Sequence, residues 1–229
     1  MTTPKNANFK AASKATPFIL FDIDQTLYHP DTGVEMAQVV GRINLLIAEK
    51  LRISIEAADA VRECWYRKYS SAFEGIEKHL GVPTHMIADF VYEDGIDLSV
   101  IPANPALKRE LERLRAQGCR LAVLSNGSCR HAERVLEHLG ITHLFERVWG
   151  FDSFPNGICK PHHHAFRHVM AEWQVNPAEL TLVEDSTSNL RTAEKLGIAG
   201  RVLIRPNQPT DGVHTAWAAT INDWLRQLA

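Results

Sequence analysis

The sequence predicts an α/β fold, in which helices flank a parallel β-sheet and a helical segment is inserted after the first strand. Two observations predict it. Short apolar runs alternate with stretches of helical periodicity along most of the 229 residues, which is typical of a parallel sheet with helices on both faces. Residues 34–99, in contrast, show helical spacing only. The chain is long enough for one α/β core that carries a small subdomain.

The composition is that of an ordinary globular protein. Hydrophobic residues make up 45% of the chain and charged residues 23%, and the net charge of −2 gives no electrostatic reason to expect a nucleic acid or an anionic membrane as partner. No run approaches the roughly 20 apolar residues of a membrane span. The four cysteines form no C-x-x-C pair, which favours a reducing, cytoplasmic setting. Residues 1–16 contain lysines but neither acids nor an apolar segment, and we expect them to form a flexible tail.

The first strand is expected at Phe18–Phe21, directly before the two acids Asp22 and Asp24. Four apolar residues in a row suit a strand that is covered on both faces. Carboxylates at the end of such a strand carry a high desolvation cost unless a cation meets them. Because parallel sheets bind ligands at the carboxyl ends of their strands, the sequence predicts a divalent metal ion at this point.

The insertion follows the first strand. Apolar residues at helical spacing predict a helix over about 39–51, and a second helix is expected after Ser54 with acids in its first turn. Residues 81–84 break the helical pattern, and Pro102 is near the point where the alternation of strands and helices begins. We therefore expect a helical cap at residues 30–101 and an α/β core made of residues 17–29 and 102–229.

The remaining chain is expected to alternate between helices and strands. Apolar runs predict strands at 121–124, 148–150, 180–183 and, as the last strand, 202–204. Helices are expected at 107–118, at 131–139, after Lys160 with Pro161 in the favoured first position, at 188–196, and in a closing helix that carries Trp217, Ile221, Trp224 and Leu225. The apolar stripe of that closing helix is expected to pack on its own sheet, which favours a monomer.

Polar side chains follow three of these strands, so they can converge on one crevice. Asp22 and Asp24 follow the first; the others are Ser125, Asn126, Glu184 and Asp185, with Lys160 at a predicted helix start. Clustered carboxylates suit a hard cation such as Mg²⁺, while Ser125, Asn126 and Lys160 could hold a phosphate. The set therefore predicts phosphoryl transfer, with Asp22 attacking phosphorus and Asp24 moving protons.

In order and spacing, Asp22-Ile-Asp24-Gln-Thr26-Leu27, Ser125-Asn126, Lys160-Pro161 and Glu184-Asp185-Ser186 resemble the four motifs of the haloacid dehalogenase (HAD) superfamily of phosphatases. The resemblance implies a HAD-like Rossmannoid sheet. It implies that Asp22 is the nucleophile, and that Asp24 is the acid/base and a metal ligand through its backbone carbonyl. Asp185 would be a side-chain ligand of Mg²⁺, and Glu184 a direct or water-mediated one.

The closer resemblance is to the pyrimidine 5′-nucleotidase branch. It rests on residues 21–28, on the helical insertion and on Cys159-Lys160-Pro161-His162. It implies a nucleoside 5′-monophosphate as substrate and a small phosphorylated metabolite as the partner. Gln25 stands where such sequences more usually carry Asn or Gly, and His162-His163-His164 stands where an Asp is common, which loosens the assignment to this branch.

Other interpretations share the core motifs. A sugar-phosphate or phosphoglycolate phosphatase, or a sugar-phosphate mutase, would differ only in what the cap admits. A haloacid dehalogenase would need neither Asp24 as an acid nor the metal site at Glu184 and Asp185. A binding protein without catalysis is disfavoured because every catalytic position carries a competent residue.

Aromatic residues of the insertion are candidates for substrate contacts. Trp65, Tyr69 and Phe73 recur at helical spacing, and together with Tyr28 they could stack on a nucleobase. The competing interpretation, which is more usual for a helical aromatic stripe, is that they form the core of the cap. A transition-metal site at residues 162–164 is disfavoured, because adjacent helical residues point in different directions.

Overall fold

The computed structural model describes residues 17–28, 34–69, 71–93, 96–154, 159–208 and 212–228. The predicted tail at residues 1–16 and part of the predicted turn after Tyr28 lie outside these ranges. The described residues form a six-stranded sheet in the order β3-β2-β1-β4-β5-β6, and all neighbouring strands are parallel. The strands are β1 (Phe18–Phe21), β2 (Arg120–Leu124), β3 (Arg147–Trp149), β4 (Leu180–Glu184), β5 (Gly200–Ile204) and β6 (Ala216–Ala218).

The central position of β1 follows from its sequence. All four of its residues are buried, as expected for an apolar strand covered on both faces. Phe21 is in register with Val123 of β2 and Val183 of β4. The residues that follow these three strands therefore emerge at the same edge of the sheet, which brings the predicted motifs together.

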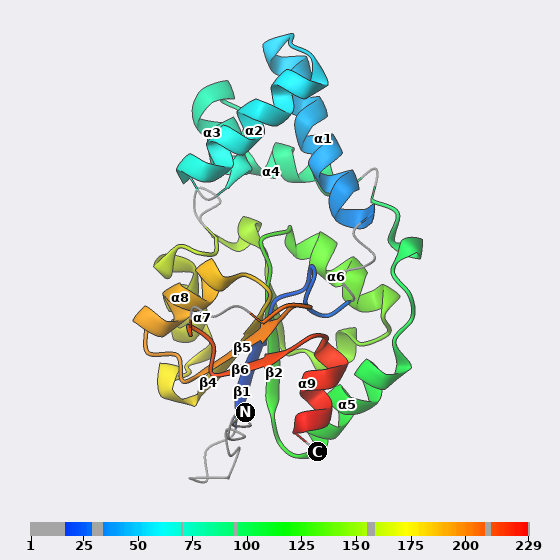
Figure 1. Ribbon diagram of the computed structural model, residues 1–229, viewed down its shortest axis with the longest axis vertical. Helices are drawn as coiled ribbons and strands as arrows, with labels where there is room; N and C mark the ends of the chain where they lie inside the picture. Colours follow the sequence, from blue (N-terminus) through cyan, green and yellow to red (C-terminus); the bar gives the residue numbers. More distant parts are fainter. Residues whose placement is uncertain are drawn as a thin grey trace.

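Helices cover the two faces of the sheet, as predicted for an α/β protein (Figure 1). Phe21 contacts the rings of Phe145 and Trp224 edge to face, with centroids 5.8 and 6.2 Å apart, so the last helix packs against the centre of the sheet. The flanking helices are α5 (Pro105–Ala116), α6 (Cys129–His138), α7 (His163–Trp173), α8 (Thr187–Lys195) and α9 (Ile221–Gln227), with short 3₁₀ turns at Thr142–Leu144, Phe151–Ser153 and Pro177–Glu179.

The described part of the insertion between β1 and α5 consists of helices joined by short turns and contains no strand. Its elements are α1 (Val34–Leu51), α2 (Ile55–Tyr69), α3 (Ala72–Leu80), α4 (Thr84–Ala88), a π-helical turn (Asp89–Glu93) and a 3₁₀ turn (Leu98–Val100). Figure 1 shows α1 to α4 gathered beyond one end of the sheet. The predicted break falls where Gly81 caps α3 with a left-handed φ of 65°, a conformation that glycine adopts at little cost.

Two element predictions are wrong in detail. Trp217 lies in the sixth strand, which pairs with β5, and the closing helix begins only at Ile221 because the Thr220 side chain caps it. Pro161 is not the first residue of a helix, since α7 begins at His163 with His162 as its N-cap residue. Within the described residues, no helix is both long enough and apolar enough to cross a membrane.

Candidate active site

Asp22 is buried directly after β1, and both of its carboxylate oxygens are held. Oδ1 accepts a hydrogen bond from Lys160 Nζ at 2.6 Å, and Oδ2 accepts one from Thr26 Oγ1 at 2.9 Å. Lys160 also donates to Glu184 Oε2 at 2.8 Å. The turn after β1 returns Thr26 to Asp22, while β4 and the segment before α7 supply the other two groups. The carboxylate is therefore held in one orientation at the carboxyl edge of the sheet.

Negative charge exceeds positive charge around Lys160. Burial, reinforced by Glu184, raises the pKa of Asp22 to about 7, although Lys160 opposes the shift. Burial, together with Glu184 and Asp22, raises the pKa of Asp185 to about 9. The desolvation of Lys160 is outweighed by its two carboxylate partners, which raise the pKa of its ammonium group. The ammonium alone does not compensate the clustered acids.

Three of these acids could share a metal ion. One carboxylate oxygen from each of Asp22, Glu184 and Asp185 lies within 4.8 Å of the other two. Carboxylate oxygens are the preferred ligands of hard divalent cations, and burial together with the neighbouring acids raises the pKa values of Asp22 and Asp185. The residues therefore fit such a cation. Asp24 is the fourth predicted ligand, and its carboxylate is not part of this cluster. The atom of Asp24 predicted to bind the metal is its backbone carbonyl oxygen.

Asp24 is held by a separate set of donors. Tyr28 donates its hydroxyl hydrogen to Oδ1 at 2.8 Å, His131 Nε2 lies 3.0 Å from the same oxygen, and Ser125 Oγ lies 3.4 Å from Oδ2. Burial alone would raise the pKa of Asp24, but His131 and the hydrogen bonds hold it below its usual value. The two aspartates thus differ in protonation tendency although they are two residues apart.

His131 is a site residue that the sequence reasoning missed. It is buried in the first turns of α6, its ring lies 4.7 Å from that of Tyr92, and Ser128 caps the helix before it. A Cβ on Gly127 would lie 2.9 Å from His131 Cδ2, so this turn requires glycine. The available signal was a histidine four residues before Val135 on the apolar face of a helix that begins beside a predicted phosphate loop.

The end of β2 contributes two predicted residues. Ser125 Oγ is buried and accepts a hydrogen bond from the Gly127 backbone N–H at 2.9 Å. Asn126 Nδ2 donates to the backbone oxygen of Lys160 at 2.9 Å, which ties the β2 loop to the lysine segment. The predicted motifs therefore meet, and Asn126 has a positioning contact that the sequence did not reveal.

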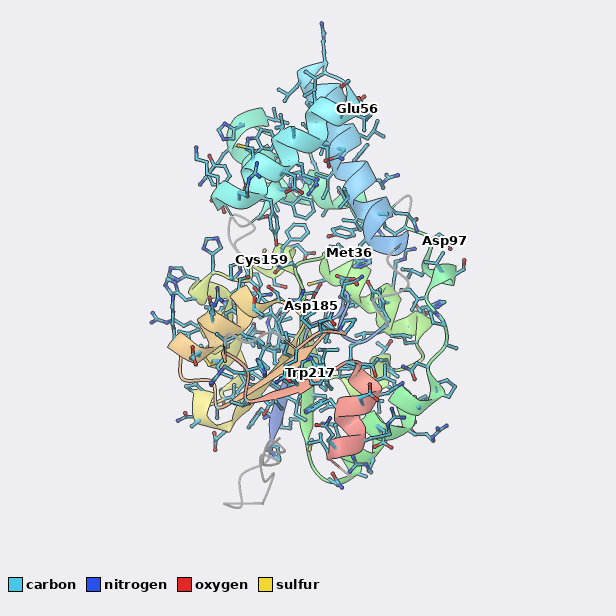
Figure 2. All side chains as sticks on the ribbon, in the orientation of Figure 1. Met36, Glu56, Asp97, Cys159, Asp185 and Trp217 are labelled. Atoms are coloured by element: carbon cyan, nitrogen blue, oxygen red, sulfur yellow. The ribbon has the colours of Figure 1, made fainter. Side chains whose placement is uncertain are left out.

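A cavity of about 480 Å³ lies between this edge of the sheet and the insertion. Asp22, Asp24 and Lys160 line its floor, together with Glu184 and Asp185. In Figure 2, Met36 lies at the lower end of α1 and Asp185 lies below it, near the end of β4. The lining residues from the insertion are Met36, Val39, Tyr66, Arg67 and Tyr92.

The aromatic residues predicted to contact substrate lie elsewhere. Trp65 stacks on the His79 ring at 5.3 Å, Tyr69 hydrogen-bonds to the same histidine at 2.9 Å, and Phe73 packs 5.0 Å from Phe151. None of them, nor Tyr28, is among the residues that line the cavity. The face of α2 that carries Trp65 and Tyr69 packs inside the insertion. The adjacent residues Tyr66 and Arg67 line the cavity. The packing interpretation of the stripe accounts for these contacts.

The three consecutive histidines do not form a metal cluster. His162 Nε2 lies 3.7 Å from Glu74 Oε2 of the insertion, and the rings of His163 and His164 are 4.2 Å apart. Among the described residues, the group capable of holding a metal consists of Asp22, Glu184 and Asp185.

Known proteins share both the sequence pattern and the fold. The sequence profile of the family described as "haloacid dehalogenase-like hydrolase" matches residues 19–202. A phosphoglycolate phosphatase of Vibrio parahaemolyticus is 32% identical over 187 residues, which cover 79% of this chain and 80% of the relative. A phosphoglycolate phosphatase of Pasteurella multocida is 32% identical over 111 residues, so this match spans only about half (48%) of each chain.

Among solved structures, a HAD phosphatase from Thermococcus onnurineus superposes with a TM-score of 0.65 at 19% identity, and the match covers 93% of this chain and 98% of that one. That likeness confirms the α/β fold. The family profile covers most of β1, Asp22 and Asp24 after it, and the whole of β4. This chain therefore belongs to the haloacid dehalogenase-like hydrolase family, and it is a hydrolase.

Proposed function

We propose that the protein is a Mg²⁺-dependent phosphatase that hydrolyses a small phosphomonoester through an aspartyl-phosphate on Asp22. The observation that carries this proposal is the orientation of Asp22 beside the cluster formed with Glu184 and Asp185. A carboxylate attacking carbon, as in a dehalogenase, would not need that cluster. The names of the relatives support phosphate esters as the substrate class.

Asp22, Glu184 and Asp185 would hold Mg²⁺ through their side chains, and the family resemblance adds the backbone carbonyl of Asp24. When bound, the ion supplies the positive charge that these carboxylates lack and neutralises charge on the phosphate. Ser125, Asn126 and Lys160 are the residues that we propose bind the other phosphate oxygens.

In the first step, an oxygen of Asp22 forms a bond to phosphorus and the bond from phosphorus to the ester oxygen breaks. Asp24 gives its proton to the leaving oxygen. In the second step, Asp24 takes a proton from a water molecule, whose oxygen attacks the phosphorus of the aspartyl-phosphate. The bond between phosphorus and the Asp22 oxygen breaks, so that inorganic phosphate leaves and the Asp22 carboxylate is restored.

These steps need an ionised Asp22 and a protonated Asp24. In the free protein the pKa values favour the opposite arrangement, since that of Asp22 is raised and that of Asp24 is lowered. The pKa of Asp22 is raised to about 7 by burial and Glu184, while His131 holds that of Asp24 low. An incoming phosphate dianion raises the pKa of a nearby carboxyl group, and a nearby cation lowers it. Substrate and cation together are therefore expected to reverse the order.

We propose that residues 30–101 act as a cap that excludes water while the ester reacts. The insertion lines one side of the cavity, which supports this role. The four cysteines are free thiols, which supports a reducing, cytoplasmic setting.

For the substrate, a phosphoglycolate-type ester is better supported than a nucleotide. The relatives are named phosphoglycolate phosphatases. Of the aromatic residues expected to stack on a base, Trp65 and Tyr69 pack on His79 inside the insertion and Phe73 packs against Phe151 of the core. A pyrimidine nucleoside 5′-monophosphate, which the motif resemblance favoured, is the second candidate.

The test is hydrolysis of p-nitrophenyl phosphate with Mg²⁺ and with EDTA, followed by a comparison of phosphoglycolate with uridine and cytidine monophosphates. We expect metal-dependent turnover that is lost in Asp22→Asn, and a higher kcat/KM for phosphoglycolate. Undiminished turnover in Asp22→Asn contradicts the mechanism. A higher kcat/KM for either nucleotide contradicts the substrate assignment alone.

A further inference from the structure

Resting on the proposed function, we propose that Arg67 binds an anionic group on the non-transferring part of the substrate, so that the enzyme selects phosphomonoesters that carry a carboxylate. Arg67 lies in the last turn of α2, on the insertion side of the catalytic cavity. It is separated in sequence from every motif that carries the chemistry.

Arg67 differs from Lys160, the other cationic side chain of the cavity, in its contacts with the rest of the described chain. Among the described residues that line the cavity, the lysines and arginines are Lys160 and Arg67. Lys160 is buried and its ammonium is occupied by Asp22 and Glu184. Within the described parts of the chain, neither a hydrogen bond nor an ion pair engages Arg67. Arg67 is therefore available to a ligand.

The chemistry of the group favours a carboxylate. A guanidinium offers a planar pair of N–H donors that matches a carboxylate bidentately. The remaining lining residues of the insertion are Met36, Val39, Tyr66 and Tyr92, and none of these residue types offers a competing positive charge. A short ester with phosphate at the floor and carboxylate toward α2 meets both sets of groups, whereas the nucleoside part of a pyrimidine nucleotide carries no anion.

The experiment compares phosphoglycolate with ethyl phosphate, in which a methyl group replaces the carboxylate. The quantity measured is the ratio of kcat/KM for the two substrates, in wild type, in Arg67→Gln and in Lys68→Gln. Lys68 is the matched control, because it is a neighbouring cation of α2 that does not line the cavity. We expect Arg67→Gln to lower the ratio about 10- to 100-fold, mainly through KM for phosphoglycolate, and Lys68→Gln to leave it unchanged.

An unchanged ratio in Arg67→Gln, or an equal fall in Lys68→Gln, overturns the inference while leaving the phosphatase proposal intact. A wild-type ratio near one also overturns it. Failure of the proposed function is distinct, since wild type would then hydrolyse neither ester.

A different observation points to Gln25, and we propose that its side-chain amide donates a hydrogen bond to a substrate oxygen. Gln25 lines the floor of the same cavity, between Asp24 and Thr26. Its φ of 64° lies in the left-handed region, which is costly for a residue with a Cβ. Its Nε2 is buried without a hydrogen-bond partner, which costs further stability.

Both costs fall on the free protein, and within the described chain no hydrogen bond to Nε2 offsets them. An acceptor oxygen of a bound ester would satisfy Nε2, so the side chain gains its partner only in the complex. Strained residues of this kind occur at ligand-binding sites, where the stability of the surrounding structure holds them in place.

Two variants separate the backbone cost from the hydrogen bond. Gln25→Gly removes both the strain and the amide, whereas Gln25→Ala removes the amide and keeps the strain. We expect kcat/KM for phosphoglycolate to fall about 10-fold in both variants, and the Tm of Gln25→Gly to exceed that of Gln25→Ala. A kcat/KM that stays at the wild-type value in either variant, or a fall confined to the less stable variant, overturns the inference.

Discussion

At the residue scale, the site separates two neighbouring aspartates by giving them different partners. Asp22 shares Lys160 with Glu184, whereas Asp24 is surrounded by Tyr28, Ser125 and His131. The first set leaves a deficit of positive charge and the second supplies hydrogen-bond donors. The proposed division of roles between attack by Asp22 and proton transfer by Asp24 therefore rests on the different neighbours of the two side chains.

His131 provides a test of this division. Replacing it with Asn removes a group that holds the pKa of Asp24 down, although burial acts in the opposite direction. Because the pKa of Asp24 rises, the limb of the pH profile of kcat/KM that reports Asp24 should move to higher pH. We also expect kcat to fall about 10- to 100-fold, which is less than the roughly 10²- to 10⁴-fold contribution of an acid/base group itself, because Asp24 remains in place.

The measurement is the pH profile for p-nitrophenyl phosphate, with the melting temperature as a control for folding. A profile that coincides with that of the wild type at reduced kcat would show that His131 does not set the pKa of Asp24.

At the element scale, the strands that precede the chemistry could be predicted because their apolar runs are unbroken and end in polar groups. The sixth strand could not, since Ala216-Trp217-Ala218 contains one large apolar residue, which also fits the spacing of the following helix. The meeting of Asp22, Ser125 and Glu184 at one edge of the sheet was predictable from the same register of parallel strands. The positions of Arg67 at the cavity and of His131 beside Asp24 were not predictable, because they depend on which face each helix turns toward the end of the sheet.

The close contact of α2 with α3 yields a prediction for stability. A Cβ on Gly75 would lie 2.5 Å from Cβ and Cγ of the buried Trp65, so Gly75→Ala must displace α3 from α2. We expect the free energy of unfolding to fall by about 1–3 kcal/mol, as for overpacking of a core. Chemical denaturation measures this change.

Gly41→Ala is the matched control, because nothing lies within 4 Å of the added Cβ in α1. We expect it to raise stability by up to about 1 kcal/mol through helix propensity. An unchanged free energy of unfolding in Gly75→Ala would contradict this prediction, because it would show that α2 and α3 accommodate the added Cβ without loss of stability.

At the scale of the whole molecule, the fold places uncompensated acids at the end of its central strands and covers them with the insertion. The resulting cluster should make global stability depend on pH and on a divalent cation. Burial and neighbouring acids raise the pKa of Asp22 to about 7 and that of Asp185 to about 9. Acids whose pKa is raised on folding contribute stability that is lost as pH rises through the folded values.

The metal-free protein should therefore lose stability between about pH 4, the ordinary pKa of an aspartate, and about pH 9, by a few kcal/mol in all. Mg²⁺ should oppose this loss, because it binds the ionised carboxylates and stabilises the state that binds it. The Mg²⁺-dependent rise in Tm should thus be larger at pH 8 than at pH 6, and Asp185→Asn should reduce both effects. A rise in Tm that is independent of pH, or that persists fully in Asp185→Asn, would contradict this account.

The central claim is that Asp22 becomes phosphorylated, and peptide mass spectrometry after rapid acid quenching tests it most directly. Wild type mixed with Mg²⁺ and phosphoglycolate, and Asp22→Asn treated identically, are quenched during turnover and digested. The account predicts one added phosphoryl group on the peptide that contains Asp22 in wild type and none in the variant. A phosphoryl group on any other residue, or the same modification in Asp22→Asn, would contradict it.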